Sequence, residues 1–169
     1  MLAPKVTGIA LVTTALFLIT LSQAWSEEFL LRGVRSEQQA EALNQALRRV
    51  PSAKFPNRVL APANGEEASL TAFFLSPYNS DVGDLARAVS SVRGCSLTLV
   101  LRAPGLSAAK GDQLRAALRG VRGVDAIAST ADVKHQLIRV RLDGKGGARR
   151  EEIQKALADY GVKSEGEGE

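Results

Sequence analysis

The sequence has little of the chemistry on which catalysis usually depends. Cys95 is its single cysteine and His135 its single histidine. One cysteine allows no intramolecular disulfide, so the fold must be stabilised by packing. No pair of carboxylates has a suggestive spacing, and no nucleophile has an identifiable base. The sequence therefore predicts a protein that is not an enzyme.

The chain also lacks a strong excess of either charge. Its formal net charge is +4, and removal of an N-terminal segment containing Lys5 leaves +3. A charge this small does not by itself indicate a nucleic-acid or membrane partner.

Residues 1–26 have the pattern of a secretory signal peptide. A short segment with one lysine precedes the uncharged apolar run 6–21, and small residues then permit cleavage after Ala24 or Ser26. The run is shorter than the roughly 20 residues that span a bilayer. We expect a periplasmic or secreted protein with no stable membrane span after cleavage; an uncleaved anchor is the alternative.

The remainder of the chain contains an internal repeat. Residues 46–50 (ALRRV) match residues 117–121 (ALRGV) at an offset of 71, and Gly33 matches Gly105 at an offset of 72. The offset drifts by only a few residues, as expected when loops vary and elements persist. We infer two copies of one unit, with domains at 27–94 and 95–163 and a disordered tail at 164–169.

Each copy predicts the order strand, helix, strand, strand, helix. The expected elements of the first copy are 28–32, 36–50, 58–61, 69–75 and 80–92, with a hairpin turn at Asn64-Gly65; those of the second are 96–103, 107–121, 124–129, 136–142 and 149–160. This order predicts an α+β fold of two tandem ferredoxin-like (βαββαβ, split βαβ) units, with antiparallel sheets and helices on one face. The sequence leaves open whether strand 96–103 closes the first sheet or opens the second.

The strand-to-helix corner of the second copy resembles a known metal loop. Residues 105–111 (GLSAAKG) are similar to the G-M-T-C-x-x-C loop of heavy-metal-associated (HMA) domains. The stretches RGVRGVDAIAS and HQLIRVRLDGKGGARREEIQKALADYGV resemble later parts of that domain, and the first copy fits more loosely. The resemblance implies a ferredoxin-like fold and, in the family, binding of a soft metal between two thiolates.

Both copies lack the cysteines of this motif. The two cysteine positions fall on Ala108 and Gly111 in the second copy, and on Ser36 and Gln39 in the first. Neither Ala108 nor Gly111 has a side-chain donor, whereas Ser36 and Gln39 have the spacing of a helix capping box. We therefore expect degenerate copies with no cofactor and no soft metal in the loops.

Two residues outside the loops are weak candidates for metal binding. Cys95 is expected to be a half-buried apolar residue; the alternatives are a disulfide-linked homodimer and a single-thiol ligand completed by another protein. His135 is expected to be a solvated turn residue, and the alternative is weak metal binding or pH sensing.

Alternation along two strands predicts a basic and partly apolar surface. If Leu99, Leu101 and Ala103 face the helices, the opposite face of the sheet carries Val100, Arg102, Leu137, Arg139 and Arg141. This face has no aromatic residues on which RNA bases stack, so we expect no nucleic-acid partner. Either the other copy covers it or it binds another envelope protein.

These observations favour an exported, non-catalytic protein with two HMA-like domains that have lost their metal ligands and serve protein interaction. The alternative is a periplasmic heavy-metal-binding or metal-transport accessory protein that uses Cys95, His135 or a dimer interface.

Overall fold

The computed structural model describes residues 25–63, 67–74 and 81–162. Its strands and helices, in chain order, are β1 (Trp25–Arg32), α1 (Glu37–Arg48), β2 (Ala53–Lys54), β3 (Ala68–Phe74), α2 (Val82–Ser90), β4 (Ser96–Arg102), α3 (Ala108–Leu118), β5 (Val124–Asp132), β6 (Leu137–Leu142), α4 (Arg150–Ala156) and the 3₁₀ helix η2 (Ala158–Tyr160). The α+β class predicted from the sequence is confirmed. Asn64-Gly65 and the tail 164–169 lie outside the described residues.

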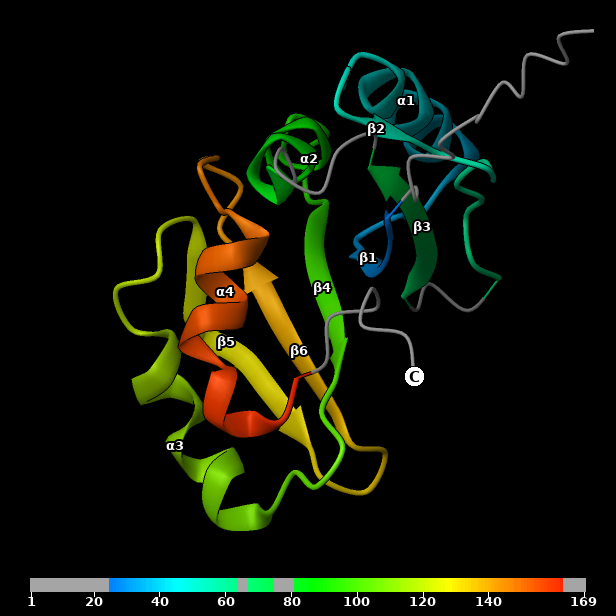
Figure 1. Cartoon of the computed structure of the whole chain (residues 1–169). Coiled ribbons are helices and arrows are strands. Elements are labelled where there is room, and N and C mark those ends of the chain that lie inside the picture. Colours follow the sequence, from blue (N-terminus) through cyan, green and yellow to red (C-terminus); the bar gives the residue numbers. More distant parts are fainter. Residues whose placement is uncertain (1–24, 64–66, 75–80, 163–169) are drawn as a thin grey trace, which may run out of the picture.

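The strands form one six-stranded antiparallel sheet in the order β2-β3-β1-β4-β6-β5 (Figure 1). Strand β4 pairs with β1 on one side, where Leu99 lies opposite Phe29, and with β6 on the other, where Leu99 lies opposite Val140. It therefore closes the sheet of the first half and opens that of the second. The molecule has one continuous sheet where two sheets were expected.

The strand order explains how the halves are joined. The first four neighbours, β2-β3-β1-β4, have the order and antiparallel directions of a ferredoxin-like unit, with α1 and α2 as its crossovers. In the second half β5, β6 and β4 repeat the first three positions, and β1 occupies the place of the fourth strand. The two central strands thus belong to both units.

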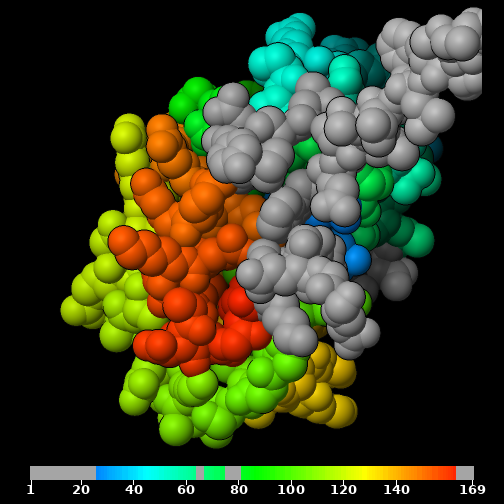
Figure 2. Space-filling model, in the orientation of Figure 1, coloured from blue at the N-terminus to red at the C-terminus, as the bar shows by residue number. Residues whose placement is uncertain are grey.

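The core lies on one face of this sheet. Alternate strand residues are buried on that face, among them Phe29, Leu31, Leu70, Ala72, Phe74, Leu97, Leu99, Leu101, Ile138, Val140 and Leu142. The helices cover them with the leucines of α1 and α3 and with Leu85, Val89, Ile153 and Leu157. Figure 1 shows α4, in orange, lying in front of β5 and β6, and Figure 2 shows the orange to red atoms of this part of the chain on the surface of the molecule. Complete burial of a Val, Leu, Ile or Phe side chain stabilises the folded state by about 1.5–3 kcal/mol relative to leaving that side chain exposed.

Short polar side chains cap the start of three of the four α-helices in the described residues, whereas α4 begins after Arg149 with no side-chain cap. The Ser36 Oγ accepts a hydrogen bond from the Gln39 backbone N–H (3.2 Å), and the Ser107 Oγ accepts one from that of Lys110 (3.4 Å). The Asp81 carboxylate caps α2 by accepting from the Gly83 N–H (2.9 Å). Such caps satisfy backbone donors that have no partner within the helix.

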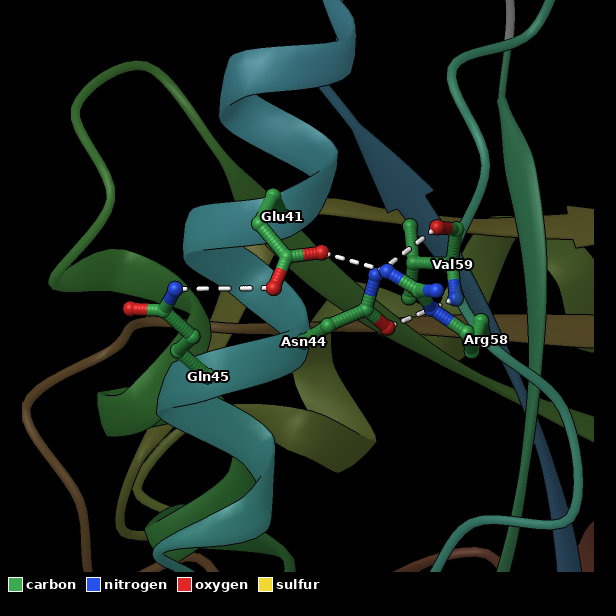
Figure 3. A network of polar contacts seen from close by, with 5 residues as sticks. All are labelled: Glu41, Asn44, Gln45, Arg58 and Val59. Atoms are coloured by element: carbon green, nitrogen blue, oxygen red, sulfur yellow. Dashed lines mark hydrogen bonds and ion pairs between the residues drawn. The ribbon is translucent and has the colours of Figure 1, made fainter.

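The strand expected at residues 58–61 is wrong. Val59 is buried, but its backbone N–H and C=O bond to the side-chain amide of Asn44 on α1 (2.8 and 2.9 Å), while Arg58 pairs with Glu41 (Figure 3). These backbone groups are satisfied by a helix side chain, so the segment needs no neighbouring strand. The edge of β3 that does not pair with β1 pairs instead with β2, which is only two residues long.

The first strand begins earlier than expected. Trp25 and Ser26 pair with Phe74 and Phe73, so β1 starts two residues before the predicted domain start at residue 27. Cleavage after Ala24 would leave the whole strand intact, whereas cleavage after Ser26 would remove its first two residues.

A buried ion pair connects the halves. Glu27 of β1 and Arg150 of α4 are paired, and their side chains are each only 5% exposed. Because the pair joins the first strand to the last α-helix, it links the two ends of the described chain through the core.

Within residues 25–63, 67–74 and 81–162, no helix combines the length and hydropathy that a membrane crossing requires.

Candidate functional site

The corner of the second half is held by Gln136 and not by ligands to a metal. Gly105 has a φ of +83°, and the Gln136 Oε1 accepts hydrogen bonds from the backbone N–H groups of Gly105 (2.6 Å) and Leu106 (2.9 Å). The Gln136 Nε2 donates to the Leu106 carbonyl (3.1 Å). One side-chain amide therefore bonds to three backbone groups of the turn, which two backbone hydrogen bonds of Ala103 also hold. No pattern in the sequence indicates this role; in the structure the left-handed φ of Gln136 (+55°) marks a constrained position.

The two positions that match cysteines in the HMA loop line a shallow hollow. Ala108 and Gly111 lie at the start of α3, beside β5, in a hollow of about 480 Å³. A Cβ built on Gly111 would lie 3.3 Å from the Ala131 Cβ, so helix and strand approach each other closely there. No side chain at either position carries a donor atom for a metal.

In the first half the matching positions act as a helix cap. Besides the Ser36 bond described above, the Gln39 Oε1 accepts from the Arg35 N–H (2.8 Å), and its Nε2 donates to the Arg93 carbonyl (3.3 Å). These contacts tie the start of α1 to the turn that precedes β4. Ser36 caps α1 as predicted, whereas the Gln39 side chain bonds to the residue before the N-cap and to the Arg93 carbonyl.

Cys95 lies beside the first corner, although it is far from it in the sequence. Its Sγ is 3.7 Å from the Gly33 carbonyl oxygen, because Arg32 and Ser96 are paired neighbours in β1 and β4. Cys95 is buried, and burial raises the pKa of its thiol. A raised pKa keeps the thiol protonated near neutral pH and makes it a poor metal ligand.

His135 is exposed and is paired with Asp132. The His135 Nδ1 lies 2.8 Å from the Asp132 Oδ2, and the His135 backbone N–H donates to the Asp132 Oδ1 (3.1 Å). The hydrogen bonds from His135 lower the pKa of the Asp132 carboxyl below its usual range. The pair closes the turn between β5 and β6.

The structure does not bring Cys95 and His135 together. Cys95 precedes β4, whereas His135 precedes β6, which runs antiparallel to β4, so the two residues lie at opposite ends of that strand. Seven strand residues span roughly 23 Å, well beyond the size of a metal site. In the described part of the chain, no group of three or more His, Cys, Asp or Glu residues is arranged to hold a metal ion.

The five residues predicted to share the other face of the sheet do lie together. Val100 is opposite Arg139, and Arg102 is opposite Leu137, on the face turned away from the buried residues of β4 and β6. Arg141 is opposite Thr98 on the same face. Arg102 is exposed, and the other four are half-buried. We call this set, Val100, Arg102, Leu137, Arg139 and Arg141, the open face.

The arginines of the open face are held close to the sheet. The Nε atoms of Arg139 and Arg141 are buried and have no hydrogen-bond partner among the described residues. Burial lowers the pKa of the Arg141 guanidinium, and the nearby charge of Arg32 lowers it further, against opposing effects of Glu67 and Asp125. Among the described residues the halves lie side by side in one sheet, so neither half is stacked on the open face of the other.

Comparisons with known proteins give only distant likenesses. No protein-family model matches the chain, and no curated protein matches it in sequence. The water-soluble region of the P-type ATPase CopA from Bacillus subtilis is 14% identical, with a TM-score of 0.34 over 85% of this chain and 94% of that one. A solution structure of the N-terminal soluble domains of the same CopA is 14% identical, with a TM-score of 0.33 over 86% and 99%.

A third solved structure comes from a different class of protein. A putative C-terminal regulatory domain of aspartate kinase from Porphyromonas gingivalis is 13% identical, with a TM-score of 0.29 over 83% of this chain and 95% of that one. Scores this low carry no argument about function. The ferredoxin-like assignment therefore rests on the strand order and pairing of this chain itself.

Proposed function

We propose that the chain is an exported, non-catalytic protein of two HMA-like units without CxxC ligands, and that its open face binds an acidic segment of another envelope protein. The observation that carries this proposal is the arrangement of Val100 and Leu137 among Arg102, Arg139 and Arg141 on adjacent strands. Apolar contact area supplies affinity, and the positive charges favour a partner of opposite charge.

The state of Arg141 supports a negatively charged partner. Its guanidinium is partly desolvated and lies near the like charge of Arg32, the two causes that lower its pKa. A carboxylate from a partner would offset both effects, because arginine forms bidentate bonds to carboxylates.

Export is the second part of the proposal. The signal-peptide pattern of residues 1–26 supports it, and the extent of β1 favours cleavage after Ala24, which keeps Trp25 and Ser26 in the strand. The mass of the protein purified from the envelope tests this directly. A mature chain that begins at Trp25 is expected, whereas a full-length chain found in the membrane would indicate a retained anchor.

Photo-crosslinking in cells tests the open face. A photoreactive residue at Val100 is expected to give one discrete adduct, and the same residue at Gln45, which is exposed on α1, should give none. Arg102→Glu should abolish the Val100 adduct, while Arg48→Glu on α1 serves as the matched control. Equal adducts from both positions would contradict the assignment of the open face.

Metal titration separates this proposal from its rival. Metal handling through Cys95, His135 or a dimer interface predicts tight, stoichiometric binding of copper(I) or zinc that is lost in Cys95→Ser or His135→Ala. We expect neither metal to bind tightly to the wild-type chain. A non-reducing gel should show a monomer, because Cys95 is buried; a disulfide-linked dimer would support the rival.

A further inference from the structure

A basic hollow lies where the start of α2 meets the loop between β6 and α4. Asp81 and Arg149 form a backbone bridge, and the Gly83 N–H donates to the Ala148 carbonyl (2.9 Å). In Figure 1 this loop, in orange, lies next to α2, in green. The hollow has a volume of about 490 Å³, within the usual range for small-molecule sites.

Four cationic side chains from separate segments line this hollow. Arg87 comes from α2, Arg122 from the turn before β5, and Lys145 and Arg149 from the loop before α4. Two carboxylates, Asp81 and Glu152, also lie on its wall, so the lining has an excess of two positive charges. Like charges gathered in one concave site raise the local concentration of anions.

The glycines of the loop allow the guanidinium groups to come close to the backbone. Gly146 and Gly147 have φ values of +88° and +82°, which strongly favour glycine. A Cβ on Gly146 would lie 2.0 Å from the Arg87 Nη2, and a Cβ on Gly147 would lie 2.7 Å from the Arg122 Nε. Two guanidinium groups therefore pack against side-chain-free backbone at the edge of the hollow.

The internal contacts leave much of this positive charge uncompensated. Asp81 accepts from the Gly83 N–H, and Arg87 pairs with Asp84 (3.0 Å). Neither the guanidinium of Arg122 nor that of Arg149 has an ion-pair partner within the described residues, and all three of Arg122, Lys145 and Arg149 are exposed to solvent. Their donors are available to a ligand.

From these contacts we propose that the hollow binds a small molecule through a phosphate group. A guanidinium donates in a fixed fork that matches two oxygens of a phosphate, and an ammonium adds a point charge. Arg122 and Lys145 are the principal contacts, Arg149 adds charge at the rim, and the hollow has room for more than the phosphate itself. The site lies on the helix side of the sheet, so it does not depend on the open face or on its partner.

Calorimetric titration of the purified full chain at low salt tests the proposal. The probes are pyrophosphate, glycerol 3-phosphate and orthophosphate, which separate a phosphoester from the free ion. We expect saturable one-to-one binding of at least one probe, with NMR shifts at the amides of Gly146 and Gly147. Saturation by any of the three supports the site and identifies the source of the phosphate, whereas no saturation by any at millimolar concentration overturns it.

Matched variants locate the binding. Arg122→Ala and Lys145→Ala should each weaken the affinity about tenfold, the loss expected for one charge-assisted contact. Arg48→Ala removes the same charge from α1, away from the hollow, and should change the affinity less than about twofold. An equal loss of affinity in all three variants would show that the probe responds to the net charge of the protein and not to the hollow, and would overturn the proposal. The unfolding midpoint of each variant confirms that it is folded.

Discussion

The two halves of the molecule contain the same elements in the same order but support them differently. The first corner, at Gly33, lies against the backbone of Gly94 and Cys95, whereas the second, at Gly105, is open on that side and is held by the side chain of Gln136. A glutamine lies at each corner, but Gln39 bonds to the Arg35 N–H and the Arg93 carbonyl, whereas Gln136 bonds to the turn glycine itself. The comparison shows that a close backbone contact at one turn glycine takes the place of a side-chain hydrogen bond at the other.

The halves also differ at their junction. At the offset of 72 Glu27 of β1 aligns with Leu99 of β4, and Arg150 at the start of α4 aligns with Val82 at the start of α2. The ion pair that joins the halves therefore corresponds to two apolar residues at the aligned positions. All four residues are buried. The contrast allows a direct test of what the ion pair contributes.

Breaking the ion pair should have the largest effect. Arg150→Met leaves the buried Glu27 carboxylate without its cation, and we expect a loss of about 3–5 kcal/mol in the free energy of unfolding. The double variant Glu27→Leu/Arg150→Val copies the aligned residues and should be close to wild type or more stable. Urea unfolding measures both. A double variant as unstable as the single one would show that the halves are not interchangeable here.

Substitution of the corner glycines sharpens the contrast between the corners. In Gly33→Ala the Cβ would lie 2.0 Å from the Gly94 carbonyl oxygen, so strain in φ adds to a backbone clash, and we expect a loss of about 3–5 kcal/mol. Gly105→Ala has a similar φ but no atom within 4 Å of the new Cβ, and should cost only about 1–2 kcal/mol. Equal losses of stability in the two variants, measured by thermal unfolding, would mean that the positive φ alone accounts for the cost and that the contact with Gly94 adds nothing.

Removal of the glutamines tests the side-chain support of each corner. Gln136→Ala leaves the Gly105 amide without its acceptor, while the Leu106 amide keeps its bond to the Ala103 carbonyl (3.1 Å); it should cost about 1–3 kcal/mol and speed hydrogen exchange most at Gly105. Gln39→Ala at the first corner should cost about 0.5–1 kcal/mol, since Ser36 still caps the helix. Unchanged exchange at Gly105 in the Gln136 variant would contradict this role.

The smallest effect is expected from acid titration of Asp132. The pKa of Asp132 is lowered in the folded state, so its contribution to stability is present above the unfolded value and is lost as pH falls through the folded value. The stability difference between wild type and Asp132→Asn should therefore be visible near about pH 7 and disappear near about pH 2. Urea midpoints at both pH values measure it, and a constant difference would contradict the pairing with His135.

The features that depend on local periodicity could be predicted from the amino-acid sequence. The buried face of each helix follows from the spacing of residues such as Leu43 and Leu47, and the caps at Ser36 and Ser107 follow from short polar side chains before an apolar run. Alternation likewise placed Val100 and Arg139 on the same face of the sheet. The prediction of a strand at residues 58–61 was wrong, because hydrogen bonds from the Asn44 side chain to the Val59 backbone replace those of a neighbouring strand. The residues of the segment do not reveal this replacement.

Which strands and loops are neighbours could be learned only from the folded molecule. Strand β4 is shared by both halves because β1 and β6 pair with its two edges. The hydrogen bonds between strands join backbone groups, so the residue types of a strand do not reveal its neighbours. The same pairing places Cys95 beside Gly33, and the bridge between Asp81 and Arg149 brings Arg87 to the basic hollow. These contacts join residues far apart in the chain, where periodicity carries no information.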